Sequence, residues 1–82
     1  MVEIRFDKKF VALFSKLKDP IIKHRISVQI KKTSENPEVG KPMMHTRTGT
    51  RELYVSSFRL SYEYFKNKEI VYILDLYHKD EQ

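Results

Sequence analysis

The second half of the chain carries a set of charged side chains that could act together on a phosphodiester. They are the Arg, Lys, His and Glu residues on or beside the last three predicted strands: Lys41, Arg47, Arg51, Glu52, Arg59, His78 and Lys79. Arginine can donate two hydrogen bonds to one phosphate, and histidine can transfer a proton near neutral pH. Such a set suffices for RNA cleavage without a metal ion, because the 2′-hydroxyl is the nucleophile and the protein supplies positioning, proton transfer and phosphorane stabilisation.

Arg59 is the member of this set that the sequence positions best. Apolar and polar residues alternate over residues 58–64, which predicts a strand with one buried face and with Arg59 on its open face. A second strand is predicted over residues 50–55, and a tight turn at residues 56–57 joins the two. Tyr54 is expected on the same open face, where an aromatic ring can stack on an RNA base.

Each of these residues also has a purely structural explanation, which the residues alone leave open. Arg59 could form an ion pair with Glu63 or Asp75 on the same face. Glu52 could be only a charge partner of a neighbouring base, His78 could be an ordinary surface histidine at a strand end, and the exposed aromatic could have no ligand.

Other kinds of site are not supported by the sequence. The three histidines, His24, His45 and His78, are too scattered for a metal motif. There is no Gly-rich phosphate-binding loop, and no Ser/His/Asp set can be assembled from the spacing. The chain has no Cys, which excludes disulfides and thiolate metal sites. We therefore expect neither a metal nor a small-molecule cofactor.

Length and charge limit the possibilities further. The 82 residues predict one small domain, residues 1–82. The formal net charge of +5 indicates an anionic partner, either nucleic acid or an acidic protein segment. Residues 1–32 hold nine Lys or Arg and three Asp or Glu, a balance of +6. No apolar run approaches the ~18 residues that span a bilayer, and no secretory segment opens the chain, so we expect a cytoplasmic protein.

The elements that must position the charged side chains follow from the hydrophobic pattern. A strand over residues 2–6 is followed by two helices, one starting after Asp7 as an N-cap and the next at the pair Asp19-Pro20. Apolar residues recur on one side of each helix at helical spacing: Phe10, Leu13, Phe14 and Leu17 in the first, and Ile22, Ile26 and Ile30 in the second.

The remaining segments complete a sheet. Residues 34–42 are rich in turn-forming residues and are predicted to be a loop. Residues 70–77 are apolar on both faces, as in an interior strand. The order strand, two helices, three strands predicts an α+β fold in which a two-helix hairpin packs on a mainly antiparallel four-stranded sheet.

Three segments of the chain form an ordered pattern. They are Asn-Pro-Glu-Val-Gly-Lys-Pro at 36–42, Gly-Thr-Arg-Glu-Leu-Tyr-Val-Ser-Ser-Phe-Arg-Leu-Ser-Tyr-Glu at 49–63 and Leu-Tyr-His-Lys-Asp-Glu-Gln at 76–82. In this order and at this length, they resemble the RelE/ParE superfamily of toxins from toxin–antitoxin systems. The superfamily has a fold of the kind predicted above, and the resemblance covers nearly the whole chain.

The resemblance implies a ribosome-dependent endoribonuclease that cuts mRNA in the decoding site and inhibits translation. It implies a RelB-like antitoxin as partner, which we expect to be acidic and partly disordered. It assigns transition-state stabilisation to Arg59, and proton transfer and phosphate contact to His78 and Lys79. The other candidates are Arg51 and Glu52 for catalysis, and Lys41, Arg47 and Tyr54 for RNA binding.

The sequence also departs from the superfamily pattern. Glu52 and Tyr54 stand where nucleolytic members commonly have basic residues, and Met43 stands where a subgroup carries Glu. These departures keep a second hypothesis open. The chain would then be a non-catalytic, ParE-like module that inhibits DNA gyrase or acts only through its antitoxin complex.

Overall fold

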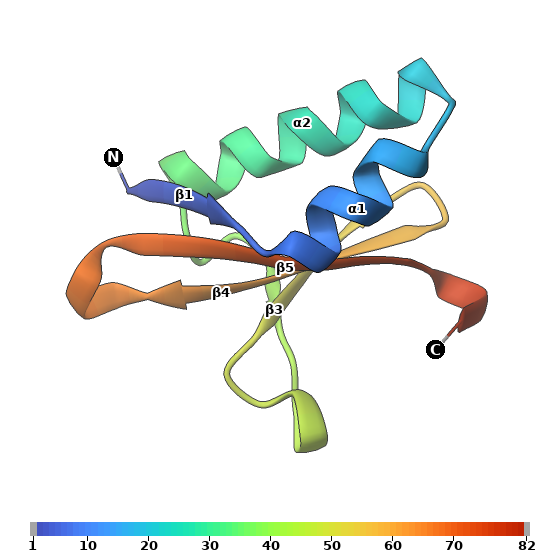
Figure 1. The fold of residues 1–82 in the computed structure, drawn as a ribbon. Helices are drawn as coiled ribbons and strands as arrows, with labels where there is room; N and C mark the ends of the chain where they lie inside the picture. Colours follow the sequence, from blue (N-terminus) through green and yellow to red (C-terminus); the bar gives the residue numbers. More distant parts are fainter. Residues whose placement is uncertain (1, 82) are drawn as a thin grey trace.

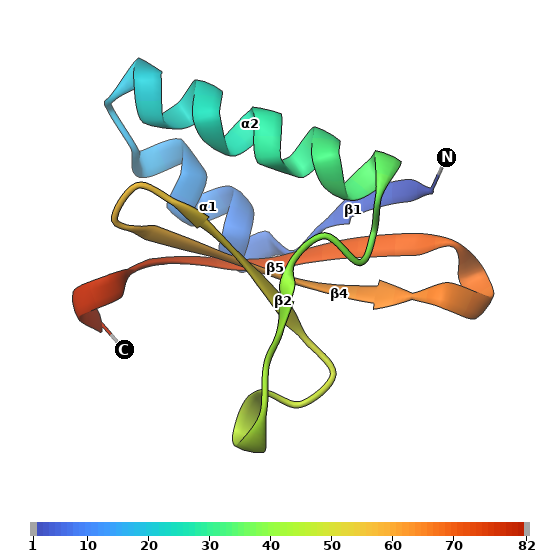
Figure 2. The same ribbon diagram turned by 180° about the vertical axis from the view of Figure 1, so that it is seen from behind.

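A five-stranded sheet with both helices on one of its faces forms the fold (Figures 1 and 2). The structure, a computed structural model, describes residues 2–81. The strands are β1 (Glu3–Phe6), β2 (Lys41–Pro42), β3 (Arg51–Val55), β4 (Phe58–Phe65) and β5 (Ile70–His78), and the helices are α1 (Lys8–Lys16) and α2 (Pro20–Glu35). The sheet order is β1-β5-β4-β3-β2, and only the pair of β1 and β5 is parallel. The predicted α+β fold with a mainly antiparallel sheet is therefore confirmed.

The number of strands differs from the prediction of four. The additional strand, β2, lies in the segment predicted to be a loop, and it pairs with β3 through Lys41 opposite Glu52 and Pro42 opposite Arg51. Turn-forming residues around β2 conceal this pairing in the sequence. Pro42 fits this strand because β2 lies at the edge of the sheet. At an edge, a residue without an N–H can point that position away from the neighbouring strand, so no hydrogen bond between strands is lost.

Both helices begin where the sequence predicts. The side chain of Asp7 accepts a hydrogen bond from the backbone N–H of Lys9 at 2.8 Å, and that of Asp19 accepts one from Ile21 at 2.9 Å. Pro20 occupies the first turn of α2, where it lacks only an N–H that would have no helical partner. Within residues 2–81, neither helix has the length and apolar character needed to span a membrane.

The core lies between the helices and the sheet. Leu60 and Tyr62 of β4 are fully buried there, with Val71 and Ile73 of β5 and Ile26 of α2. The predicted apolar face of β4 is thus confirmed. The pairing of β4 with β5 shifts by one residue between Ser61 and Tyr62, and this irregularity determines which side chains of β5 lie on the uncovered face.

Tyr62 also holds the segment before β2 against the core. Its hydroxyl donates to the carbonyl of Pro37 and accepts from the N–H of Gly40, both at 2.8 Å. A Cβ at Gly40 would lie 2.7 Å from Cε1 of Tyr62, so this close approach requires glycine. Arg51 adds hydrogen bonds to the carbonyls of Glu38 at 3.0 Å and Gly40 at 2.8 Å. The chain therefore enters the sheet at a defined position.

This arrangement predicts an alkaline loss of stability. Burial raises the pKa of the Tyr62 phenol above its usual 10.0. Because the folded-state pKa is the higher one, the contribution of Tyr62 is complete below about pH 10 and is lost as the pH rises through the folded pKa. Tyr62→Phe should lower the free energy of unfolding at pH 7 by about 1 kcal/mol or more. Above about pH 10, its stability should fall less steeply than that of the wild type.

Urea unfolding at pH 7 and above about pH 10 measures how steeply the stability of wild type and Tyr62→Phe falls with pH. Tyr64→Phe, on the same strand, is the control. An equally steep alkaline fall in wild type and Tyr62→Phe would contradict the assignment.

Candidate functional site

The face of the sheet opposite the helices carries a row of aromatic and cationic side chains. Tyr54 of β3 pairs with Arg59 of β4, and Arg59 pairs with Tyr77 of β5. Residues directly opposite each other in an antiparallel pair point to the same side, so these three share the uncovered face. The neighbouring row on the same face consists of Glu52, Ser61 and Asp75.

Arg59 lies over the ring of Tyr54. The carbon of its guanidinium group is 3.9 Å from the ring centre, and Nη1 donates to the carbonyls of Phe58 at 3.1 Å and Ser56 at 3.3 Å. In the part of the chain that the structure describes, Arg59 forms no ion pair with a carboxylate. The ion pair that the sequence left open is therefore not formed, and the guanidinium group keeps its charge available on the uncovered face.

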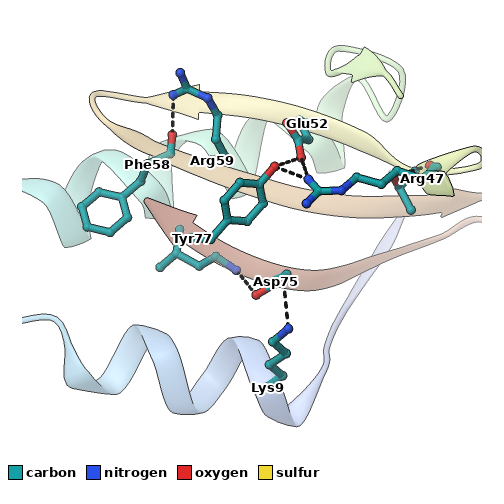
Figure 3. Close-up of polar contacts among 9 residues, drawn as sticks. Lys9, Arg47, Glu52, Phe58, Arg59, Asp75 and Tyr77 are labelled. Carbon is teal, nitrogen blue, oxygen red and sulfur yellow. Dashed lines mark hydrogen bonds and ion pairs between the residues drawn. The ribbon is translucent and has the colours of Figure 1, made fainter. Parts of the chain in front are cut away.

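Glu52 is the centre of a second cluster on this face (Figure 3). Its side chain is only 1% exposed, and Oε2 accepts a hydrogen bond from Nη1 of Arg47 at 2.8 Å and another from the hydroxyl of Tyr77. Arg47 also donates to the phenol oxygen of Tyr77. A buried carboxylate is stable only when it is paired and hydrogen-bonded, and these two side chains provide both.

Arg47 comes from the short 3₁₀ turn His45–Arg47 between β2 and β3, not from the sheet. Its guanidinium carbon lies 4.9 Å from the centre of the Tyr77 ring, and the side chain is 44% exposed. The hydrogen bond with Tyr77 raises the pKa of Arg47, with smaller contributions from Glu52, against the lowering effect of burial. Arg47 therefore presents a fixed positive charge above a buried negative one.

A cleft of about 380 Å³ opens beside this cluster. Its lining includes the cations Lys9 and Arg47, the carboxylate of Asp75 and the phenol of Tyr77, but not Glu52. Nζ of Lys9 is 3.1 Å from Oδ2 of Asp75, an ion pair that joins α1 to β5 (Figure 3). Within residues 2–81, no group of three His, Asp or Glu could hold a metal ion.

The predicted terminal pair lies elsewhere. His78 pairs with Phe58, and the two rings meet edge to face with centroids 5.5 Å apart. Phe58 packs against the core on the helix side of the sheet, so His78 faces away from Arg59. Nδ1 of His78 accepts a hydrogen bond from the N–H of Asp80 at 3.2 Å. Lys79 follows the strand and is exposed. The structure does not bring this pair to Arg59, and its catalytic role stays a prediction.

The two remaining candidates lie on opposite sides of the sheet. Arg51 points to the helix side, where it holds the segment before β2 and lies 3.5 Å from the carboxylate of Glu38. Lys41 pairs with Glu52 at the sheet edge and is exposed. The structure therefore groups Lys41 with the uncovered face and separates Arg51 from it.

Comparison with known families agrees with this architecture. The sequence matches a family model over residues 4–82, and that family is described as the ParE toxin of the type II toxin–antitoxin system parDE. The chain belongs to the ParE toxin family. The RelE/ParE resemblance of its sequence segments is thereby confirmed, and the protein is a toxin of a toxin–antitoxin system.

Solved structures of toxin–antitoxin complexes are similar to this ParE-family toxin over most of its length. A chain of the RelBE2 complex from Mycobacterium tuberculosis is 26% identical, with a TM-score of 0.83, and the match covers 94% of this chain and 96% of that one. The intact RelBE complex from E. coli gives 15% identity, a TM-score of 0.79 and coverage of 93% and 94%.

The archaeal RelE–RelB complex from Pyrococcus horikoshii OT3 gives 15% identity, a TM-score of 0.79 and coverage of 99% and 98%. At such identities, the E. coli and archaeal matches show the fold alone. A search of curated proteins found no significant match.

Tyr77 is the residue of this ParE-family toxin that sequence analysis missed. It alternates with Asp75 on β5, which is a weak signal for a shared face. The strand is apolar on both sides, however, and the shift in its pairing with β4 cannot be counted from the sequence. The family pattern drew attention to His78, which is adjacent in the chain and faces the other side of the sheet.

Proposed function

We propose that this ParE-family toxin inhibits translation by cutting mRNA held on the ribosome. The observation that carries the proposal is the grouping of Arg59, Arg47 and Glu52 on the uncovered face of the sheet. Two guanidinium groups suit the charge that develops on a phosphorane, and a carboxylate is suited to receive a proton. Tyr54, which is 56% exposed, offers a ring on which a base can stack.

The reaction needs no nucleophile from the protein. The 2′-oxygen of the ribose attacks the adjacent phosphorus, the bond from phosphorus to the 5′-oxygen breaks, and a 2′,3′-cyclic phosphate and a 5′-hydroxyl result. Arg59 stabilises the phosphorane, while Arg47 and Lys41 contact the RNA backbone. Because the substrate is mRNA on the ribosome, the toxin acts in the cytoplasm.

Programmed ribosomes provide the test. Purified toxin is added to ribosomes that carry a defined mRNA with an empty decoding site, and cleavage is mapped by primer extension. We expect a cut in the decoding site and no cut in the same mRNA free in solution. Intact mRNA on the ribosome would overturn the proposal.

A second candidate is favoured by the family that the sequence matches. The match is to ParE, and the resemblance described above associates ParE-type members with DNA gyrase. Glu52 and Tyr54 also replace the basic residues of nucleolytic members. Loss of supercoiling by purified gyrase, with mRNA intact on ribosomes, would support this candidate in place of the first.

We further propose that the antitoxin docks on the helical hairpin through an acidic amphipathic helix. An apolar groove of about 470 Å³ runs along α1, α2 and β1, lined mainly by Phe6, Phe10, Val11, Phe14 and Ile30. A cation lies beside it, since Nζ of Lys23 is 5.2 Å from the ring centre of Phe14. An antitoxin helix with apolar side chains on one face could fill the groove. Acidic side chains at the edges of that face could pair with nearby cations of the toxin.

Association with the antitoxin should then depend on salt. The two helices of the hairpin carry seven cations: Lys8, Lys9, Lys16, Lys23, Arg25, Lys31 and Lys32. Complementary charge raises the association rate at low salt, and screening removes this gain. We expect the on-rate for the product of the neighbouring gene to fall at least ~10-fold between ~0.05 and ~0.5 M salt, with a smaller change in the off-rate. Stopped-flow mixing measures both, and an unchanged on-rate would exclude steering by these cations.

A further inference from the structure

Glu52 is a buried carboxylate that a substrate cannot reach directly. Its side chain is 1% exposed and does not line the cleft beside it. Among residues 2–81, Arg47 and Tyr77 donate the hydrogen bonds to its Oε2, and both of them line the cleft. Arginine stays protonated in proteins and cannot relay a proton at neutral pH, whereas a phenol can give one proton and take another. Tyr77 is therefore the connection between the buried carboxylate and the cleft.

We propose that Tyr77 is a catalytic residue that carries the proton of the ribose 2′-hydroxyl to Glu52. The inference rests on the proposed function, since it names the proton acceptor of that reaction. In the same step, the 2′-hydroxyl gives its proton to the phenol oxygen and the phenol proton moves to Oε2 of Glu52. The 2′-oxygen forms its bond to phosphorus, and the departing 5′-oxygen takes a proton from water. After the product leaves, Glu52 returns its proton to water through Tyr77.

The surroundings of Tyr77 suit a ribose and its phosphate. The cleft offers the hydroxyls of Ser61 and Thr50 and the carboxylate of Asp75, which are hydrogen-bond partners for sugar hydroxyls. Arg47 donates to the phenol oxygen and is half-exposed, so it can hold negative charge on that oxygen and meet the phosphate. Arg59 is the cross-strand neighbour of Tyr77. RNA, rather than DNA, is the substrate that provides the 2′-hydroxyl.

Tyr77→Phe tests the inference because it removes one hydroxyl and leaves the ring under Arg47. General acid–base groups contribute ~10²- to 10⁴-fold. We therefore expect the single-turnover rate on programmed ribosomes to fall at least ~100-fold, with ribosome affinity changed less than about threefold. Glu52→Gln, which still accepts the Tyr77 hydrogen bond but takes no proton, should show the same loss. Thermal unfolding of each variant confirms that it folds.

The double variant separates a relay from two independent roles. If the proton passes through both groups, Tyr77→Phe with Glu52→Gln loses no more than either single variant. Losses that multiply would overturn the relay. Tyr72→Phe removes a hydroxyl elsewhere on β5 and is the matched control, expected at the wild-type rate.

Two further results would overturn the inference in different ways. If wild type cuts mRNA and Tyr77→Phe cuts it equally fast while His78→Gln does not, the proton passes through His78, and the proposed function stands without Tyr77. If wild type leaves the mRNA intact on programmed ribosomes, the proposed function fails and the relay fails with it.

Discussion

Arg59→Ala is expected to abolish growth inhibition and to leave the fold intact. The loss of one preorganised donor from a developing oxyanion typically lowers the rate ~10²- to 10³-fold. Arg59 donates hydrogen bonds to the carbonyl of Ser56 in the β3–β4 turn and to that of Phe58, the first residue of β4. Its guanidinium group lies over the exposed ring of Tyr54. One of these hydrogen bonds is exposed and the other is only partly buried, so we expect a change in the free energy of unfolding of about 1 kcal/mol or less.

The loss of toxicity is measured by growth after induction and by cleavage on programmed ribosomes. Thermal unfolding measures whether the fold stays intact. Lys31→Ala is the control, because Lys31 is an exposed cation of α2, and α2 covers the face of the sheet opposite Arg59. It removes the same charge and should keep full toxicity. Full toxicity of a stably folded Arg59→Ala variant would remove Arg59 from the mechanism.

The parts of the fold that the sequence predicts well depend on local signals. Asp7 and Asp19 cap their helices through side-chain hydrogen bonds to residues two positions later in the chain, so capping is visible in a short window. The alternation over residues 58–64 likewise placed Leu60 and Tyr62 in the core and Arg59 on the uncovered face. Each of these features can be recognised from residues within or next to a single helix or strand.

The parts that the sequence did not predict depend on contacts between distant segments. β2 is a strand because β3 lies beside it, and the buried carboxylate of Glu52 has its hydrogen-bond donors in Arg47 and Tyr77. In the sequence, Glu52 is 5 residues from Arg47 and 25 residues from Tyr77. One shifted residue in the pairing of β4 and β5 brings Tyr77, rather than His78, to the face of Arg59. No local pattern records that shift.

The second large effect concerns the apolar groove of the helical hairpin. Val11→Asp is expected to weaken antitoxin binding at least ~100-fold, since it puts a carboxylate where an apolar anchor of an acidic partner should dock. Val11 lines the groove but is 51% exposed, so its replacement leaves the core in place. Coexpressed antitoxin should then fail to restore growth, although the toxin itself stays as active as wild type.

Isothermal titration with the product of the neighbouring gene, and growth in its presence, measure this effect. Ile21→Asp is the matched control, because Ile21 is an aliphatic residue of the same hairpin, is 63% exposed and does not line the groove. It changes the net charge by the same amount, so a loss confined to Val11→Asp separates apolar docking in the groove from general electrostatic attraction. Equal affinities of the two variants would place the antitoxin elsewhere on the toxin. The lysines of the hairpin would then contribute through long-range charge alone.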